Sequence, residues 1–297
     1  MNVEKFKGIY PAVITPFTKE GKVDEEKLRA YIAYLIKEVD GLFVCGSYGS
    51  GPIMTIAERK RVTEVTLEVV NGKVPVIVHV GCSDTASTLE LAIHSEENGA
   101  DAIAAVTPFY YKHLEDVIKN HYRCIVDAVK IPVLVYNNPK YSNFSVSGDL
   151  LAELAEIGVK GIKDSSADIA LFYEYMAKVT RPDFLFLIGS QTHLVPSVVG
   201  GAHGCVSGLS NAFPRFIKDI YEKCVSGDFE SAVALQKKAN MLRTVTGSGI
   251  PIPFYHAVLP MLGIDVGYPK APFLPLPESE VQRIKKVLVE TKMVIDN

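Results

Sequence analysis

The segment "IPVLVYN" (residues 131–137) is an almost unbroken run of apolar residues. A strand with one face in water would alternate between apolar and polar residues, so an unbroken run is typical of a parallel strand buried on both faces. Similar runs occur at 8–15, 41–46, 74–81, 100–106, 159–164, 184–190 and 202–208. Because helical patterns separate them, the sequence predicts about eight βα units, the number that closes a barrel.

The segments between these runs carry helix start and stop signals. Asp24 precedes an amphipathic stretch at 24–38, Thr55 and Glu58 are close to a capping box at 55–70, and Gly99 ends a helix predicted at 84–100. After residue 210 the strand signals stop, and helices are predicted at 214–228, 229–245, 251–263 and 278–293.

The fold class is therefore predicted as α/β, a (β/α)8 TIM barrel with a C-terminal helical extension. We expect the barrel to occupy residues 1–225 and the extension residues 226–297, as one structural unit. A doubly wound open sheet is the alternative. It would usually carry a glycine fingerprint after its first strand, and "GIYPAVITPF" (8–17) has none.

Composition limits the possible partners and setting. The 297 residues are 48% hydrophobic and 22% charged, with a net charge of −3, so a large core is expected and neither nucleic acid nor an anionic membrane is an expected partner. The N-terminal residues lack an apolar run typical of a signal peptide, and no stretch approaches a membrane span. The five cysteines are scattered without CxxC spacing, which disfavours disulfides and thiolate metal sites. A cytoplasmic location is expected.

Lys163 lies inside the apolar run "GVKGIKD" (158–164), where a charged amine would cost stability. Active sites of such barrels lie at the carboxyl ends of the strands, and Lys163 is the only lysine predicted near the carboxyl end of one. A neutral buried amine can attack a ketone and form a Schiff base, which then serves as an electron sink. The alternative is a structural lysine that reaches the rim and pairs with Asp164.

Other polar residues also follow predicted strands. Tyr136 ends the neighbouring run and could relay protons, or else be a core tyrosine. "CGSYGSGP" (45–52) could present amide groups to a carboxylate, with the Ser47 hydroxyl in a proton relay, or be a simple turn. Tyr110 and Tyr111 could enter a site, their own or a neighbouring subunit's, or only pack at a subunit contact.

Metal chemistry is disfavoured by the spacing of possible ligands. The seven histidines show neither HxH nor HExxH spacing, and carboxylates are sparse at predicted strand ends. No GxSxG motif is present. We therefore predict no metal site.

Taken together, "GIKDSSAD", "VYNNP", "GSYGSGP", "TPFYY" and the opening "GIYPAVITPFTKEGKVD" resemble the dihydrodipicolinate synthase/N-acetylneuraminate lyase family over essentially the whole chain. The resemblance implies a class I lyase that forms a Schiff base with pyruvate or a related 2-oxo acid. It also implies a homotetramer, a dimer of dimers, and no cofactor, since the lysine itself supplies the electron sink.

The resemblance also implies roles for single residues. Lys163 would form the imine, Tyr136 would be the general acid and base, Ser47 would belong to the relay, and Tyr110 would act across a dimer interface. The expected substrate-binding residues are Ser47, Tyr48, Tyr111, Tyr141, Gln191, Val206 and Ser207.

Departures from the family pattern bear on the substrate. The usual GTTGE or GSTGE is "GSYGS" here, and Tyr141 falls where a synthase acting on aspartate semialdehyde typically has an arginine, with Lys140 beside it. Neither reproduces a guanidinium fork, which counts against dihydrodipicolinate synthase activity. Gln191 and Thr192 replace the acidic pair expected of a sialic acid lyase.

Three hypotheses remain at this stage. The preferred one is a lyase or aldolase that cleaves or forms a 2-keto-3-deoxy sugar acid or a similar 2-oxo acid, with an aldehyde as the other partner. The second is a synthase that condenses pyruvate with aspartate semialdehyde, gripping its carboxylate through Lys140 or another residue. The third is a non-catalytic 2-oxo acid binding protein.

Overall fold

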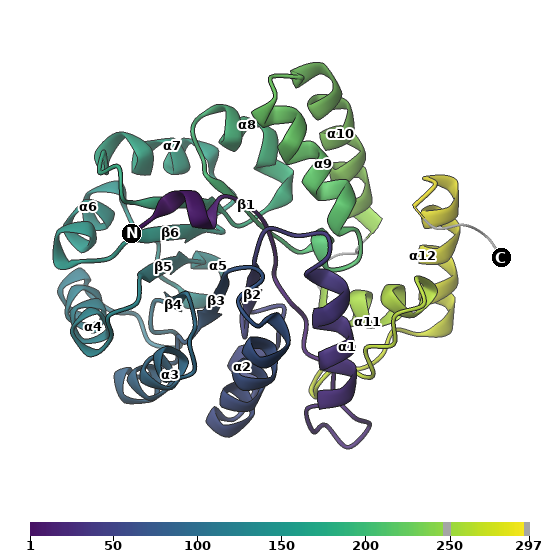
Figure 1. The fold of residues 1–297 in the computed structure, drawn as a ribbon, viewed down its shortest axis with the longest axis horizontal. Coiled ribbons are helices and arrows are strands. Elements are labelled where there is room, and N and C mark those ends of the chain that lie inside the picture. The colour runs from purple at the N-terminus through teal and green to yellow at the C-terminus, as the bar shows by residue number, and fades with distance from the viewer. Residues whose placement is uncertain (246–250, 294–297) are drawn as a thin grey trace.

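Parallel strands form the centre of the computed structural model, which describes residues 1–245 and 251–293 (Figure 1). The strands are β1 (Gly8–Pro11), β2 (Leu42–Val44), β3 (Val76–His79), β4 (Ala102–Val106), β5 (Val133–Asn137), β6 (Gly161–Asp164), β7 (Leu185–Ile188) and β8 (Gly204–Ser207). They are hydrogen-bonded in the order β1-β8-β7-β6-β5-β4-β3-β2. A parallel bridge between Ala12 and Phe43 joins the first and last strands of that order, so the predicted barrel is confirmed.

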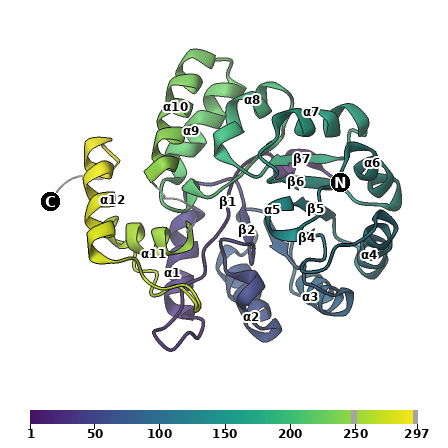
Figure 2. The same ribbon diagram turned by 180° about the vertical axis from the view of Figure 1, so that it is seen from behind.

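Helices surround the strands in both ribbon views (Figures 1 and 2). The helices of the barrel are α1 (Glu25–Leu35), α2 (Ile56–Val70), α3 (Thr85–Glu97), α4 (Glu115–Ala128), α5 (Pro139–Ser142), α6 (Gly148–Ile157), α7 (Ile169–Lys178), α8 (Leu194–Val199) and α9 (Pro214–Val225). The helices that follow are α10 (Phe229–Val245), α11 (Pro251–Met261) and α12 (Glu278–Glu290). Short 3-10 helices are η1 (Val3–Phe6), η2 (Gly51–Ile53), η3 (Gln191–His193) and η4 (Leu209–Asn211).

The predicted helix caps are present. The Asp24 side chain accepts from the Lys27 N–H, and Thr55 and Glu58 form a complete capping box. Gly99 follows α3 with a φ of +86°, a conformation that glycine adopts at little cost. These local signals fix where the helices begin and end.

The strands are shorter than the apolar runs that predicted them. Strand β1 ends at Pro11, but the Ala12 N–H still donates to Ser207 in β8 and the Val13 N–H to Phe43 in β2, and the residues that follow bond to neighbouring loops. The Ile14 N–H donates to Asn211 Oδ1 (3.2 Å) and Thr15 Oγ1 donates to the Gly49 carbonyl (2.8 Å). The apolar ends of the runs therefore build the rim of the barrel, where the loops that carry functional side chains begin.

The side-chain alternation of each strand separates two apolar layers. Inward-facing residues such as Leu134 and Leu187 fill the barrel, and outward-facing ones such as Val135 and Ile188 pack against the helices. Because the period is two, Lys163 faces the interior and the adjacent Asp164 faces the helix layer.

Helix α10 is attached to the loop that follows β7. Gln236 Nε2 donates to the Gln191 carbonyl (2.8 Å), and Gln236 Oε1 accepts from the Val195 N–H (3.1 Å). This attachment brings the last two turns of α10 to the carboxyl ends of the strands. A helix outside the barrel thereby supplies part of the rim.

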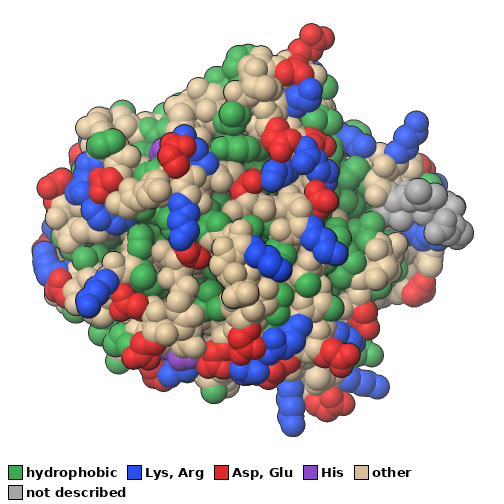
Figure 3. All heavy atoms as spheres, in the orientation of Figure 1, with side chains coloured by type: hydrophobic (Ala, Val, Ile, Leu, Met, Phe, Trp, Pro, Cys, Tyr) green, Lys and Arg blue, Asp and Glu red, His purple; other side chains and the backbone are tan. Residues whose placement is uncertain are grey.

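The surface is mixed in charge. On the face shown in Figure 3, lysine and arginine side chains are interspersed with aspartate and glutamate. None of the helices in residues 1–245 and 251–293 has the length and apolar character that crossing a membrane requires.

Candidate active site

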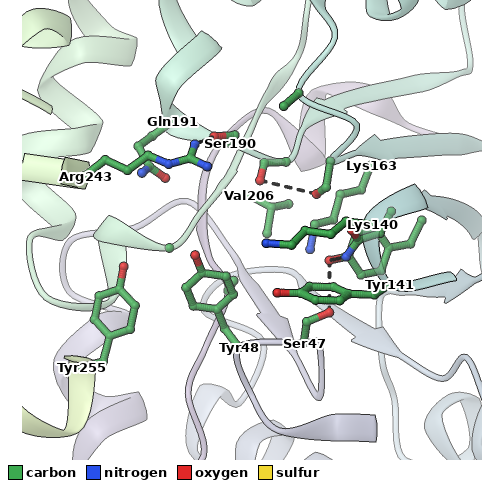
Figure 4. A pocket seen from close by; sticks show the side chains of 17 residues that line it. Ser47, Tyr48, Lys140, Tyr141, Lys163, Ser190, Gln191, Val206, Arg243 and Tyr255 are labelled. Atoms are coloured by element: carbon green, nitrogen blue, oxygen red, sulfur yellow. Dashed lines mark hydrogen bonds between the residues drawn. The ribbon is translucent and has the colours of Figure 1, made fainter. Parts of the chain in front are cut away.

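A cavity of about 260 Å³ opens at the carboxyl ends of the strands (Figure 4). Its lining comes from the loops after several strands and from α10 and α11. The lining residues are Ala12, Ser47, Tyr48, Tyr136, Asn138, Lys140, Tyr141, Lys163, Ser165, Ala167, Gly189, Ser190, Gln191, Val206, Gly208, Arg243 and Tyr255. This is where active sites of such barrels lie.

Lys163 lies at the bottom of this cavity and is 3% exposed. Its Nζ is 3.7 Å from the centroid of the Phe43 ring and 3.8 Å from that of Tyr136. Asp164 does not pair with it, because that carboxylate accepts hydrogen bonds from Asn137 and Ser166 in the helix layer. The structural alternative, a lysine paired with Asp164 at the rim, is therefore wrong.

Burial changes the protonation of this amine. Desolvation lowers the pKa of Lys163 to about 7, since two aromatic rings replace only part of the water that an ammonium would lose. The amine is therefore neutral in a substantial fraction of the molecules near pH 7, whereas an ordinary lysine is neutral in fewer than about one in a thousand. A neutral amine is nucleophilic, so this position is suited to attack on a carbonyl group.

The lowered pKa of Lys163 predicts a pH-dependent effect of Lys163→Met on stability. Below pH 7 Lys163 is protonated in both the folded and the unfolded chain, so the free-energy cost of burying its charged ammonium is fully present. Between pH 7 and about 10.5 the unfolded chain binds more protons, so the wild type gains stability as pH rises. We expect Lys163→Met to raise the free energy of unfolding near pH 6 by up to about 4 kcal/mol, and by little near pH 10.

Urea unfolding of both proteins at the two pH values measures this difference. Lys160→Met, which alters a lysine paired with Asp183 outside the cavity, is the control and should show no such gain. A stability difference between wild type and Lys163→Met that does not vary with pH would contradict a neutral buried amine.

Tyr136 stands beside Lys163 in register on the neighbouring strand. Its hydroxyl accepts from Asn138 Nδ2 (2.9 Å) and lies 3.3 Å from Ser47 Oγ. Burial raises the pKa of Tyr136, and hydrogen bonds from Ser47, Ser165 and Asn138 act in the opposite direction. At neutral pH the group is a phenol that can give its proton to a bound molecule.

The loop after β2 presents backbone groups to the cavity. Cys45 and Ser50 adopt positive φ values of 57° and 62°, which turn the loop sharply around Ser47 and Tyr48. The N–H groups of Ser47 and Tyr48 donate to no acceptor among the described residues. They are available to an anion in the cavity.

Tyr48 is accommodated by a glycine on the opposite side. A Cβ at Gly208 would lie 2.8 Å from Cε1 of Tyr48 and 3.1 Å from the Tyr255 hydroxyl. Burial raises the pKa of Tyr48 to about 12, so its hydroxyl remains a neutral donor. The tyrosine of "GSYGS" is therefore part of the cavity wall.

The structure brings most of the expected site residues together. Lys163, Tyr136, Ser47, Tyr48, Tyr141, Gln191 and Val206 line the cavity. Ser207 is buried and does not line the cavity, and its hydroxyl donates a hydrogen bond to Gln191 Oε1 (3.2 Å). Tyr110 and Tyr111 are 78% and 69% exposed and do not line the cavity of their own chain.

Several lining residues were not predicted as site residues. Asn138 and Ser165 follow strands β5 and β6 and could have been found by their position at strand ends. Arg243 and Tyr255 come from α10 and α11, and no motif in the sequence relates these helices to the barrel mouth.

No group of three or more His, Cys, Asp or Glu side chains suited to a metal ion occurs in the described part of the chain. His79 packs beside Tyr136. Its Nδ1 lies 3.0 Å from the Cys45 carbonyl oxygen in a hydrogen bond, and its Nε2 accepts a hydrogen bond from the Val106 N–H. Burial holds the pKa of His79 well below its usual range. This histidine is a neutral support for the Tyr136 ring, with 5.5 Å between ring centroids.

A barrel with a buried, readily deprotonated lysine beside a tyrosine defines a class of lysine-dependent lyases and aldolases. The family model described as "Dihydrodipicolinate synthetase family" matches residues 5–291. A 4-hydroxy-tetrahydrodipicolinate synthase from Nitrobacter hamburgensis is 34% identical over 236 residues, which are 79% of each chain.

Two solved structures are similar over nearly the full length. One is the E. coli protein YagE in complex with pyruvate, with a TM-score of 0.93, 28% identity and coverage of 97% and 99% of the two chains. The other is a catalytic lysine mutant of a sialic acid aldolase from Ruminococcus gnavus, with a TM-score of 0.93, 27% identity and coverage of 98% of both.

The chain belongs to the dihydrodipicolinate synthetase family, whose members are class I lyases. The predicted family and the predicted enzyme class are both confirmed.

Proposed function

We propose that this protein forms a Schiff base between Lys163 and pyruvate or a related 2-oxo acid, and cleaves or forms a carbon–carbon bond next to it. The single observation that carries the proposal is the buried amine of Lys163, with its lowered pKa, 3.8 Å from the centroid of the Tyr136 ring. A chain that only bound 2-oxo acids would gain nothing from this costly burial.

Imine formation follows from the positions of these two residues. The neutral Nζ of Lys163 adds to the keto carbon, and the oxygen takes a proton from the Tyr136 phenol. Loss of water then leaves a protonated imine. The free N–H groups of Ser47 and Tyr48 would hold the adjacent carboxylate.

Cleavage uses the imine as the electron sink. The Tyr136 phenolate removes the proton of the C4 hydroxyl, the C3–C4 bond breaks, and its electron pair moves into the imine to give an enamine. The aldehyde leaves, C3 takes up a proton, and water hydrolyses the imine to release pyruvate and the amine. Condensation is the reverse sequence.

The preferred substrate is a 2-keto-3-deoxy sugar acid or a similar hydroxylated 2-oxo acid. Tyr48, Gln191 and Ser190 present polar atoms in the same cavity, where hydroxyl groups would need partners. The second candidate is condensation of pyruvate with aspartate semialdehyde. It is favoured by the name of the Nitrobacter hamburgensis relative and by the two cationic residues Lys140 and Arg243 in the lining.

Tyr110 is proposed to complete the relay of a second copy of the chain in a homotetramer built from dimers. Its side chain is exposed in its own chain, so the ring is accessible to a second copy. A separate apolar pocket, lined in part by Ser47, Tyr141 and Phe109, offers space for an aromatic ring beside the relay. We further propose that the enzyme works in the cytoplasm.

A panel of aldehydes tests the proposed reaction. Pyruvate is supplied with aspartate semialdehyde, glyceraldehyde, N-acetylmannosamine and glycolaldehyde in turn, and product is measured. We expect turnover with a hydroxylated aldehyde to exceed turnover with aspartate semialdehyde at least about tenfold, because Tyr141 replaces the expected arginine. The opposite ranking would favour the second candidate, and binding without any turnover would support the non-catalytic hypothesis.

A further inference from the structure

One tyrosine at the wall of the cavity has a hydroxyl group without a protein partner. Tyr255, on α11, is 1% exposed and lines the cavity, and its hydroxyl makes no hydrogen bond within residues 1–245 and 251–293. Buried tyrosine hydroxyls usually have a partner. Three other buried tyrosines follow this rule, with an acceptor oxygen 2.6 or 2.7 Å from the hydroxyl: Tyr31, Tyr122 and Tyr175. The hydroxyl of Tyr255 is therefore available to a molecule in the cavity.

Tyr48 places a second phenol next to Tyr255. The two ring centroids are 5.7 Å apart, and Figure 4 shows both hydroxyl groups pointing to the same side of the cavity. The Tyr48 hydroxyl likewise has no hydrogen-bond partner in the described part of the chain. Burial raises the pKa of Tyr48 to about 12 and holds the pKa of Tyr255 well above its usual range. Both groups are therefore uncharged at neutral pH, and each can donate and accept a hydrogen bond.

The position of the two rings puts this pair within reach of the substrate. At Gly208, a Cβ would lie 3.1 Å from the Tyr255 hydroxyl, so the glycine leaves that hydroxyl open to the cavity. Figure 4 shows Tyr48 between Lys163 and Tyr255. The carbons of a 2-oxo acid that extend outward from Lys163 would therefore pass Tyr48 first and then reach Tyr255.

We propose that Tyr255, together with Tyr48, binds hydroxyl groups at the far end of the substrate, and that Tyr255 is a specificity-determining residue for an aldehyde half that carries such groups. This inference rests on the proposed function and assigns the recognition of its hydroxylated substrate to a helix outside the barrel. A hydroxyl group can donate to one phenol and accept from the other. A plain carbon chain would leave both phenols without partners, which lowers its affinity.

Equilibrium binding to the Lys163→Met variant, which lacks the amine needed for cleavage, separates recognition from turnover. The probes are 2-keto-3-deoxygluconate and 2-oxohexanoate, which share a six-carbon chain and a 2-oxo acid end but differ in their hydroxyl groups. Calorimetry should show 2-keto-3-deoxygluconate binding at least about tenfold more tightly. Adding Tyr255→Phe should reduce this ratio about three- to tenfold, because a hydrogen bond is lost while the ring remains, and should leave the affinity for 2-oxohexanoate unchanged.

Tyr10→Phe is the matched control. The Tyr10 hydroxyl is also buried without a partner among the residues that the structure describes, but it lies in the barrel interior and does not line the cavity, so the ratio should not change. Equal affinities for both probes in Lys163→Met, or a ratio that Tyr255→Phe leaves unchanged, would overturn the proposal. An equal loss of affinity for both probes would also overturn it, because it would indicate ring packing alone. Failure of pyruvate and borohydride to label Lys163 in the wild type would count against the proposed function alone, since binding to Lys163→Met requires no imine.

Discussion

Replacing Lys163 with methionine is expected to reduce turnover by a factor of about 10⁴ or more, because the buried amine that would form the imine is lost. Wild-type protein incubated with pyruvate and borohydride should gain a stable mass on the peptide that contains Lys163. Lys163→Met should gain none. Mass spectrometry of the digested protein measures both results.

Two variants make this experiment specific. Lys163→Arg keeps a positive charge and a long side chain but cannot form the imine, so it should be as inactive as Lys163→Met. Lys160→Met changes a lysine of the same segment that is paired with Asp183, and it should be labelled and active. Labelling of any other lysine in Lys163→Met, with activity retained, would refute the proposed nucleophile.

Replacing Tyr136 with phenylalanine is expected to lower kcat by a factor of about 10²–10³, because the hydroxyl that moves protons is lost while the ring remains. Its hydrogen bonds with Asn138 and Ser47 are lost as well. Pyruvate labelling of Lys163 should become slower but still reach completion. Steady-state kinetics and the time course of labelling provide the two measurements.

Tyr122→Phe is the matched control for Tyr136→Phe. Tyr122 is also buried and donates its hydroxyl to a backbone carbonyl, that of Ala105 (2.7 Å), but it faces the helix layer. The Tyr122→Phe variant should have a lower free energy of unfolding than the wild type but the same kcat. If Tyr136→Phe kept full kcat, the proton would have to move through another group, and the proposed mechanism would be wrong.

Much of the candidate site was predictable because barrel strands follow a simple rule. Polar side chains at the carboxyl ends of parallel strands point to one common opening, so Lys163, Tyr136, Ser47 and Gln191 could be grouped before any coordinates existed. Ser207 was expected to bind substrate from the family resemblance, and in the structure its buried hydroxyl donates to Gln191 Oε1 (3.2 Å). The sequence pattern at a strand end does not show which polar side chains will be hydrogen-bonded to one another and which will face the cavity.

Tyr110 illustrates a second limit. Its motif indicated a role in the relay, and in its own chain the side chain is exposed and away from the cavity. A single sequence does not show which contacts are made between copies.

The sequence by itself determined the barrel, its helix caps and the presence of one lysine inside a strand, because hydrophobic periodicity and capping act over a few neighbouring residues. Only the tertiary structure decided that this amine is surrounded by Phe43 and Tyr136, and that Arg243 reaches the same cavity. Desolvation and charge depend on every atom within several ångströms, and those atoms come from segments far apart in the chain.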